Sequence, residues 1–353
     1  MDTQYNGKIP ILLWPKETTM ETPSPQQQIG RMLSGYWISQ AVYVAAKLGL
    51  ADLLTDGPRT ADELAPATHT VPRSLYRLLR CLSSIGVFSE DGEHRFSLTP
   101  LSECLRSGPG SQRSLAITTG EEHYHAFGQL LYSVQTGKIA FDKVYGMPVF
   151  DFLQKHSEQA KLFDEAMVGV HGRETAAMLD AYDFSGIRVL ADVGGGNGSV
   201  LTTILKKHPN MSGILFDLPG VIERAKVNIQ AAGVADRCQA IGGSFFESVP
   251  TGPDAYLMRH IIHDWDQEKS IKVLQNIGRA MGKDGRLLVV ESVIPPGNEP
   301  SFAKLLDLVM MAIPGGEERT EDEYRQLYAA GGFQLTRIVL TKAEVSVIEG
   351  KKI

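Results

Sequence analysis

The chain has 353 residues, of which 43% are hydrophobic and 22% are charged, values that are ordinary for a globular protein. Its length exceeds what one simple core needs and predicts two domains. A net charge of -6 argues against a nucleic-acid partner, which usually needs a basic face. No apolar run reaches the ~18 residues that span a bilayer. The three cysteines, Cys81, Cys104 and Cys238, lack a CxxC spacing, which predicts reduced, mostly buried thiols in a cytoplasmic protein without a metal.

The first hundred residues predict a tail and a small helical domain. Residues 1–26 contain four prolines and a polar glutamine run, which indicates a loose tail. Residues 29–54 have a helical pattern whose apolar surface is wider than one stripe, so this helix is buried on more than one side, either in a dimer or in a deep core. Residues 59–105 predict two helices and a hairpin in winged-helix order, with a capping box at Thr60 and Glu63. We therefore expect the first domain to cover residues 1–108.

The second helix of this domain places Arg73, Arg77 and Arg80 on one face. A DNA-binding protein would use such a face, although solvent and salt bridges could equally cover it. The hairpin that follows carries Glu90, Asp91 and Glu93, which phosphates would repel. The pattern therefore favours a solvated face over DNA binding.

The second domain is expected to cover residues 109–353 and to begin with a helical segment. Residues 112–181 are rich in aromatic, histidine and methionine side chains, which indicates a substrate wall between the domains that includes Met167 and His171. Glutamates and histidines gather at 121–125, but no HExxH or comparable ligand spacing is present, so no metal site is predicted.

From residue 187 the pattern alternates between strand and helix, which predicts an α/β fold with a Rossmann-like parallel sheet covered on both faces. The chain ends in two alternating segments that predict an antiparallel pair. The predicted strands are 188–193, 213–218, 239–243, 255–258 and 286–293, the predicted helices are 199–207, 221–232, 267–281, 302–313 and 321–330, and the final pair is 334–341 and 344–349.

A glycine turn, Gly194 to Gly198, follows the first of these strands and opens a helix. Glycine takes positive φ and lets the backbone approach a ligand, and a helix N-terminus suits an anionic group. Asp217 ends the next strand, where a carboxylate can bind two ribose hydroxyls. A dinucleotide motif needs G-x-G-x-x-G, but position 199 is Ser199, so the spacing favours S-adenosylmethionine (SAM) over NAD. A purely structural turn is the remaining alternative.

His263 follows the fourth strand, at the edge of the sheet where ligands bind. Methyl transfer to a phenol needs a base, because a phenol titrates near ~10 and a histidine near ~6.5. A neighbouring carboxylate and the positive sulfonium would narrow this difference. Glu291, at the end of the fifth strand, and Glu318, after a Gly-Gly pair, are the candidate carboxylates. The alternatives are a helix-start histidine bound to backbone and a glutamate that caps a helix or forms a salt bridge.

The chain also resembles a known family. Its motifs stand in the order and spacing of the caffeate/hydroxyindole-type O-methyltransferases, including bacterial members that modify aromatic natural products. These motifs are Val193-Gly194-Gly195-Gly196-Asn197-Gly198, Phe216-Asp217-Leu218-Pro219, His263-Asp264-Trp265 and Gly315-Gly316-Glu317-Glu318-Arg319-Thr320. The resemblance implies a homodimer with an N-terminal winged-helix dimerisation domain, a C-terminal SAM domain and no metal. It implies His263 as the general base, oriented by Glu291 and Glu318.

The resemblance also implies binding residues. It implies SAM contacts from the glycine turn with Gly194 and Gly196, from Asp217 and Arg259, and from Trp265 near the adenine. It matches Met167, Met310 and Met311 to the substrate slot, although a Met-rich helix is as a bare pattern more often core. The family usually has an aspartate where Ser244 stands, so Phe245 is expected to carry more of the adenine contact by stacking.

The sequence thus predicts a SAM-dependent O-methyltransferase that acts on a hydroxyl of an aromatic small molecule. Methylation at nitrogen, carbon or a carboxyl, or another SAM-dependent reaction, remains an alternative with the same fold. A winged-helix regulator that senses SAM is the alternative from another class.

Overall fold

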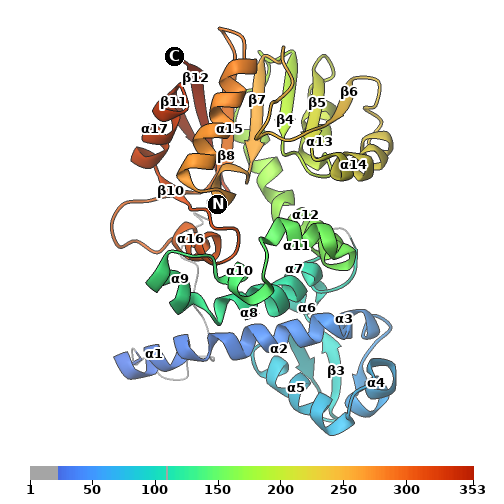
Figure 1. The fold of residues 1–353 in the computed structure, drawn as a ribbon. Helices are drawn as coiled ribbons and strands as arrows, with labels where there is room; N and C mark the ends of the chain where they lie inside the picture. Colours follow the sequence, from blue (N-terminus) through green and yellow to red (C-terminus); the bar gives the residue numbers. More distant parts are fainter. Residues whose placement is uncertain (1–22, 109) are drawn as a thin grey trace, which may run out of the picture. The chain divides into compact units, whose positions relative to one another are not determined.

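A computed structural model of the chain describes residues 23–108 and 110–353. They fall into two compact units, each described here by itself (Figure 1). The first runs to Tyr124 and includes Ser157–Val170, and the second comprises His125–His156 and His171–Ile353. Most of the tail predicted for residues 1–26 lies outside the described residues. Within them, no helix is long and apolar enough to cross a bilayer.

The first unit begins with helices, and the first of them starts earlier than the pattern predicts. Helix α1 covers Pro25–Leu33, α2 covers Gly35–Lys47 and α3 covers Leu50–Leu53. The proline at the first position of α1 lacks only an N–H that has no helical partner there, and Ser24 forms a capping box with Gln27. Residues 25 and 26 are therefore helical rather than part of a tail.

The two helices and the hairpin predicted for residues 59–105 are present. They are β1 (Arg59–Thr60), α4 (Ala61–Thr68), α5 (Pro72–Ser84), β2 (Phe88–Glu90) and β3 (Arg95–Leu98), with strand order β1-β3-β2. Helices α6 (Pro100–Glu103) and α7 (Arg113–Thr118) and a π-helix (Thr119–His123) complete this part of the unit.

The prediction that the cysteines are mostly buried is wrong. Cys238 is buried, but Cys81 and Cys104 are exposed. Helix α5 buries Leu75, Leu79 and Leu82 on one face, and this spacing leaves Cys81 on the opposite, solvent face.

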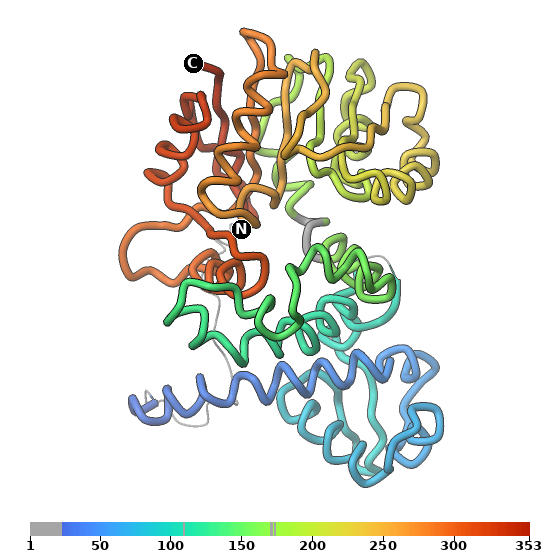
Figure 2. Tube along the Cα trace, viewed as in Figure 1, coloured from blue at the N-terminus to red at the C-terminus, as the bar shows by residue number. Residues whose placement is uncertain are grey.

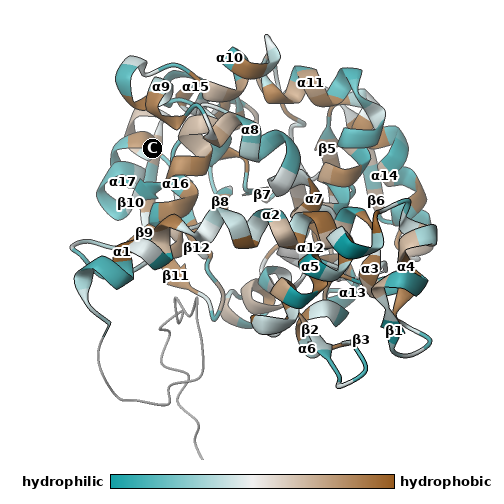
Figure 3. Ribbon diagram, turned by 90° about the horizontal axis from the view of Figure 1, so that it is seen from below, coloured by the Kyte–Doolittle hydropathy of each residue, from teal (hydrophilic) through white to brown (hydrophobic). Residues whose placement is uncertain are grey.

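The broad apolar surface of the N-terminal helices is exposed at its start and buried at its end. The last turns of α2 bury Ala45 and Ala46, whereas α1 buries nothing within the described residues. Exposed large apolar side chains lie on both helices, among them Leu33 on α1 and Trp37 on α2, which are 69% and 63% exposed. Figure 3 colours α1 and α2 by hydropathy, with brown for hydrophobic residues. The deep-core explanation therefore holds only for the end of α2.

The second unit starts with short helices: α8 (Tyr124–Phe127), α9 (Leu130–Thr136), α10 (Ala140–Tyr145) and α11 (Val149–Lys155). Phe141 and Phe152 form a core with Ala312 and Ile313, which stand at the end of α16 (Phe302–Ala312). Helix α12 (Ser157–Ala181) contributes residues to both units.

A seven-stranded sheet forms the rest of this unit, in the order β11-β12-β8-β7-β4-β5-β6. Strand β12 runs antiparallel to both of its neighbours, β11 and β8, as the predicted C-terminal pair requires, and the other neighbouring strands are parallel. The strands are β4 (Val189–Val193), β5 (Ser212–Asp217), β6 (Cys238–Gly242), β7 (Ala255–Arg259), β8 (Arg286–Glu291), β11 (Phe333–Leu340) and β12 (Ser346–Lys352). The helices are α13 (Ser199–Lys207), α14 (Pro219–Ala231), α15 (Gln267–Ala280) and α17 (Glu321–Ala330). The predicted Rossmann-like α/β fold is confirmed, and Figure 2 traces its path.

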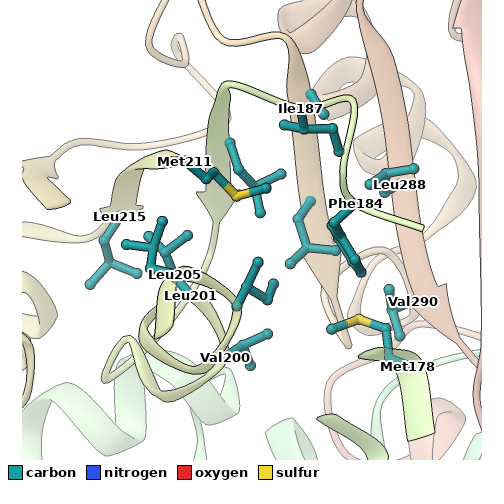
Figure 4. Close-up of a cluster of buried hydrophobic side chains, with 14 of the residues drawn as sticks. Met178, Phe184, Ile187, Val200, Leu201, Leu205, Met211, Leu215, Leu288 and Val290 are labelled. Carbon is teal, nitrogen blue, oxygen red and sulfur yellow. The ribbon is translucent and has the colours of Figure 1, made fainter. Parts of the chain in front are cut away.

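Alternating side chains divide the core between the two faces of the sheet. On β8, Leu288 and Val290 join a cluster that includes side chains of α13 and α14, part of which is drawn in Figure 4. Leu287 and Val289 join a second cluster with side chains of α15 and α17. The period of two along a strand thus holds helices on both faces and leaves the strand ends for other contacts.

One of the predicted strands was too long. The strand predicted for 286–293 ends at Glu291, and Val293–Ile294 forms a separate strand, β9. Strand β9 pairs in parallel with β10 (Arg319–Thr320). This small pairing attaches the segment around residue 318 just beyond the end of β8.

Candidate active site

The glycine turn lies between β4 and α13, where the strand order reverses around β4. Gly194, Gly196 and Gly198 have φ values of 73°, 57° and 77°, a left-handed region that favours glycine. A Cβ on Gly194 would lie 2.5 Å from the side chain of Ile261, whereas one on Gly196 would meet nothing within 4 Å. The turn is thus packed on one side and open beside Gly196.

Asp217, at the end of β5, is hydrogen-bonded to this turn. Its Oδ2 accepts a hydrogen bond from the Gly196 N–H at 2.8 Å, and its Oδ1 accepts one from the Leu218 N–H at 2.6 Å. An ionised carboxylate has about four acceptor sites, so its chemistry also suits a ligand hydroxyl. The predicted partners therefore meet at the switch point of the sheet, where ligands of this fold bind.

Asp192 is a buried acid beneath the turn that the sequence analysis did not assign. Burial raises the pKa of its carboxyl to about 7, although the charge of Arg259 opposes this. Its Oδ2 has no hydrogen-bond partner within the described residues. An acidic residue inside an apolar strand, next to the glycines, was the available signal. Arg259 in turn donates to Thr175 Oγ1 at 2.9 Å.

His263 stands in a short 3₁₀ turn, Ile262–Asp264, just after β7. Only 6% of its surface is exposed. Its Nδ1 lies 2.5 Å from Glu318 Oε1, and its Nε2 lies 3.7 Å from Asp264 Oδ1. Burial lowers the pKa of the imidazole, but the hydrogen bond to Glu318 and the surrounding carboxylates outweigh this and raise it to about 10. The arrangement makes this histidine a strong proton acceptor.

Glu291 forms its hydrogen bonds with the main chain and a tyrosine rather than with the imidazole ring, for which it was a predicted carboxylate partner. Its Oε1 accepts from the backbone N–H groups of Ile261 and His263, each at 3.1 Å. Its Oε2 accepts from the Tyr324 hydroxyl at 2.6 Å. Glu291 is completely buried and holds the main chain on which the histidine stands, which is closer to the capping alternative.

The loop after α16 is pressed against the backbone of the histidine turn. A Cβ on Gly316 would lie 2.0 Å from the carbonyl oxygen of His263, and the Glu317 N–H donates to that oxygen at 2.9 Å. Arg319, only 1% exposed, donates to the carbonyls of Ile262 and Trp265. Arg319 was not among the predicted site residues, although it belongs to the motif Gly315–Thr320.

Aromatic rings surround Trp265. The centroids of Phe150, Phe245 and Phe246 lie 5.4, 6.1 and 4.8 Å from its ring. Trp265 Nε1 is buried without a hydrogen-bond partner within the described part of the chain. Ser244 Oγ accepts from the Phe246 N–H at 3.3 Å, so it shapes the loop. The structure thus brings the two predicted aromatic contacts, Phe245 and Trp265, together.

The residues predicted to bind substrate belong to both units. Met310 is buried and its carbonyl accepts from the N–H groups of Gly315 and Gly316, so it adjoins the loop that carries Glu318. Met311 is half-buried on the same helix. Met167 is half-buried in the first unit, and the side chain of His171 lies outside the described residues.

Comparison with known proteins identifies the class. The chain matches the family model "O-methyltransferase domain" over residues 127–334 and "O-methyltransferase dimerisation domain" over residues 31–108. It therefore belongs to the O-methyltransferase family.

Individual relatives support the same class. The chain is 46% identical to the phenazine O-methyltransferase PhzM of Lysobacter antibioticus, over 92% of this chain and 95% of that one. It is 36% identical to the 8-amino-8-demethylriboflavin N,N-dimethyltransferase of Streptomyces davaonensis, over 90% and 94%. The O-methyltransferase NcsB1 from neocarzinostatin biosynthesis, solved with SAM and 2-hydroxy-5-methyl naphthoic acid, superposes with a TM-score of 0.81 at 30% identity, over 91% and 98%. This protein is a methyltransferase, and its cofactor is SAM.

Proposed function

We propose that this protein transfers the methyl group of SAM to a hydroxyl of an aromatic small molecule, with His263 as the general base. The contact between His263 Nδ1 and Glu318 Oε1 at 2.5 Å carries the proposal. It fixes the ring orientation and increases the basicity of the other nitrogen, Nε2. The prediction from the sequence therefore has geometric support.

The residues at the strand ends fit the cofactor. A Cβ on Gly196 would meet nothing within 4 Å, and the Nε1 of Trp265 is a buried donor without a hydrogen-bond partner among the described residues. Asp217 would bind the ribose hydroxyls, Phe245 and Trp265 would lie against the adenine, and Arg259 would lie near the cofactor. Ser244 offers this site a hydroxyl but no charge. When bound, SAM supplies an electrophilic methyl group on a positive sulfonium.

His263 would accept the phenolic proton at Nε2 as the hydroxyl attacks. A phenol titrates near ~10, so a base whose pKa is about 10 removes the energetic mismatch of an ordinary histidine. Glu318 would hold the resulting imidazolium at Nδ1, and Glu291 would keep the main chain of residues 261–263 in place. Met310 and Met311, with Met167 and His171, are proposed to contact the acceptor.

The test is incubation with methyl-labelled SAM and a panel of phenols, aminophenols and hydroxylated fused-ring acids, followed by mass spectrometry. We expect label on an aromatic oxygen. His263→Ala should lower turnover by at least ~10²-fold, the usual contribution of a general base, while SAM binding persists. Unchanged turnover in this variant would remove the base and leave positioning as the main effect.

Methylation of nitrogen is the second candidate, because a relative named an N,N-dimethyltransferase is 36% identical to this chain. A neutral aromatic amine can attack without losing a proton first. Label on nitrogen of an aminophenol, together with nearly normal turnover of the His263→Ala variant, would favour this candidate. Label on a ring carbon or on a carboxylate oxygen, with none on a phenolic oxygen or on nitrogen, would contradict both.

We also propose a homodimer in which α1 and α2 lie at the interface, and a domain division at residue 108. The exposed apolar residues Met32, Leu33, Tyr36 and Trp37 support the interface. The matched dimerisation domain, which ends at residue 108, supports both the homodimer and the domain division. Light scattering should give twice the chain mass, and Trp37→Glu should shift the measured mass toward that of one chain.

The free thiols of the three cysteines support the predicted cytoplasmic location, where thiols stay reduced.

A further inference from the structure

The loop that carries Glu318 is hydrogen-bonded to the helix that precedes it, α16. The N–H groups of residues 315–317 donate to backbone carbonyls, two of them to the carbonyl of Met310 on this helix. The N–H of Glu318 donates instead to a side chain, Oδ1 of Asp307, at 2.9 Å. Asp307 also belongs to α16. Of these four hydrogen bonds, the one at Glu318 is therefore the one that a substitution of its acceptor side chain can remove.

The direction of the Glu318 carboxylate depends on where its main chain is held. Its Oε1 lies 2.5 Å from Nδ1 of His263, and the side chain is fully buried. Its Oε2 is also buried and has no hydrogen-bond partner among the described residues. The carboxylate thus has the imidazole as its hydrogen-bond partner there, and the N–H of Glu318 is the nearest main-chain group that can fix its position.

Asp307 shares a helix face with two of the residues proposed to contact the acceptor. Met310 and Met311 follow it by three and four positions, and side chains at this spacing are neighbours on a helix surface. The end of the same helix packs in the core that contains Phe141 and Phe152. A single, well-anchored helix therefore carries both the proposed acceptor contacts and the hydrogen bond to Glu318.

The charged groups around Asp307 come from the elements that follow the loop. Burial raises the pKa of Asp307 and the N–H of Glu318 lowers it, while Glu323 on α17 raises it and Arg319 on β10 lowers it, with a raised pKa as the result. A carboxyl group keeps an acceptor oxygen whether or not it is protonated. The hydrogen bond to Glu318 therefore needs the oxygen of Asp307 rather than its charge.

The groups that face His263 determine how a displaced Glu318 would be detected. Burial lowers the pKa of His263, and the hydrogen bond to Glu318 is the strongest of the influences that raise it. The charges of Asp264 and Glu291 act in the same direction, and the ring of His260 lies 5.0 Å away. Movement of Glu318 away from Nδ1 should therefore lower the pKa of His263.

We propose that Asp307 is a positioning residue that holds the N–H of Glu318 and thereby aims the Glu318 carboxylate at Nδ1 of His263. Through this contact the helix with Met310 and Met311 is linked to the base. Asp307 acts through Glu318 and not on the acceptor itself. This inference rests on the proposed function of His263.

The test compares Asp307→Ala and Asp307→Leu, which remove the acceptor oxygen, with Asp307→Asn, which keeps one. Leucine fills the space of the aspartate, so it separates the lost hydrogen bond from a cavity. For a phenol identified in the panel, we expect the first two variants to lower kcat by about tenfold. The midpoint of their pH–kcat curves should fall by about one unit. Asp307→Asn should recover both values.

Two comparisons separate this role from general stability. Adding Glu318→Gln to Asp307→Ala should not move the midpoint below that of Glu318→Gln alone, because both changes act through one contact. Lys304, one turn earlier on α16, donates to the carbonyls of Gly297 and Glu299. Lys304→Ala should lower the melting temperature and leave the midpoint in place.

Three results would overturn the proposal. One is an unmoved midpoint in folded Asp307→Ala and Asp307→Leu, and another is an equal shift in Lys304→Ala. The third is an Asp307→Asn variant that is as impaired as Asp307→Ala, because the oxygen would then not be what matters.

Titration of the His263 ring by NMR in the SAM-bound protein gives a readout that needs no turnover. We expect a lower pKa of His263 in Asp307→Leu than in the unchanged protein and in Asp307→Asn. This shift without any O-methylation in the panel would contradict the proposed function but support the contact, whereas O-methylation without the shift would contradict only the role of Asp307.

Discussion

Two glycine-containing loops serve the site in different ways. In the turn from Gly194 to Gly198, glycine provides left-handed backbone and an open space beside Gly196. In the loop at Gly315 and Gly316, the second glycine allows one backbone to lie directly on another, at the carbonyl of His263. The first loop is suited to a ligand, whereas the second is suited to holding the base. Substitutions in the two loops should therefore change different kinetic constants.

The largest effect is expected from Gly316→Ala. The new Cβ would lie 2.0 Å from the His263 carbonyl oxygen, so the histidine turn must move. Displacement of a reacting group by about 1 Å can cost ~10²-fold in rate, and we expect kcat to fall by at least that factor. Steady-state kinetics and a thermal melt would measure this. Gly282→Ala, where a Cβ meets nothing within 4 Å, is the matched control, and an equal loss in both variants would contradict the explanation.

Asp217→Asn should act on the cofactor instead. The substitution removes the negative charge that holds the Gly196 and Leu218 N–H groups and faces the proposed ribose site. Hydrogen bonds to a charged group are each worth about 1.5–3 kcal/mol, so the Kd for SAM should rise by about 10- to 100-fold. Calorimetric titration would measure it.

Asp254→Asn is a close control for this prediction. Asp254 Oδ2 also accepts from two backbone N–H groups, those of Arg188 and Val189, but at the opposite end of β4. It should lower the melting temperature without changing the Kd for SAM. Equal changes in the Kd of both variants would mean that Asp217 acts only through stability.

Glu318→Gln should change the pH dependence of turnover. The carboxylate raises the pKa of His263, so its neutralisation lowers that pKa and produces the neutral base at lower pH. The midpoint of the pH–kcat curve should move to lower pH, while the plateau falls by about 10-fold because the base is weaker. Glu317→Gln, half-exposed beside Arg319, should leave the midpoint in place. An unmoved midpoint in Glu318→Gln would separate this carboxylate from the titration of the base.

Asp192→Asn should have the smallest effect on turnover and should act on stability. The folded pKa of Asp192 is about 7, above the value of 3.8 for a free aspartate, so the folded state favours the protonated form. The unchanged protein therefore loses stability from this group as pH rises from about 4 to about 7. The melting temperature of the variant, relative to the unchanged protein, should increase over this range. A difference in melting temperature that stays constant with pH would show that the buried charge of Asp192 does not lower the stability.

The same comparison explains how far the sequence could predict the site. The glycine turn, Asp217 and the order of strands and helices follow from local patterns, and they are present with small shifts at the ends. The contact between His263 and Glu318 joins residues 55 positions apart, and local patterns offered Glu318 only as one of two candidate carboxylates. No pattern indicated that Glu291 binds backbone rather than the ring, because a main-chain N–H has no sequence signature. The pairing of β9 with β10 likewise depends on tertiary packing.

Glu291 holds the main chain of the site, whereas the side chain of His263 performs the proposed chemistry. Its carboxylate holds the N–H groups of Ile261 and His263 and would do so whatever side chain stood at position 263. The backbone of this turn is thus independent of the group that it displays. A substitution at position 263 should therefore replace the displayed side chain while the backbone of this turn keeps its course.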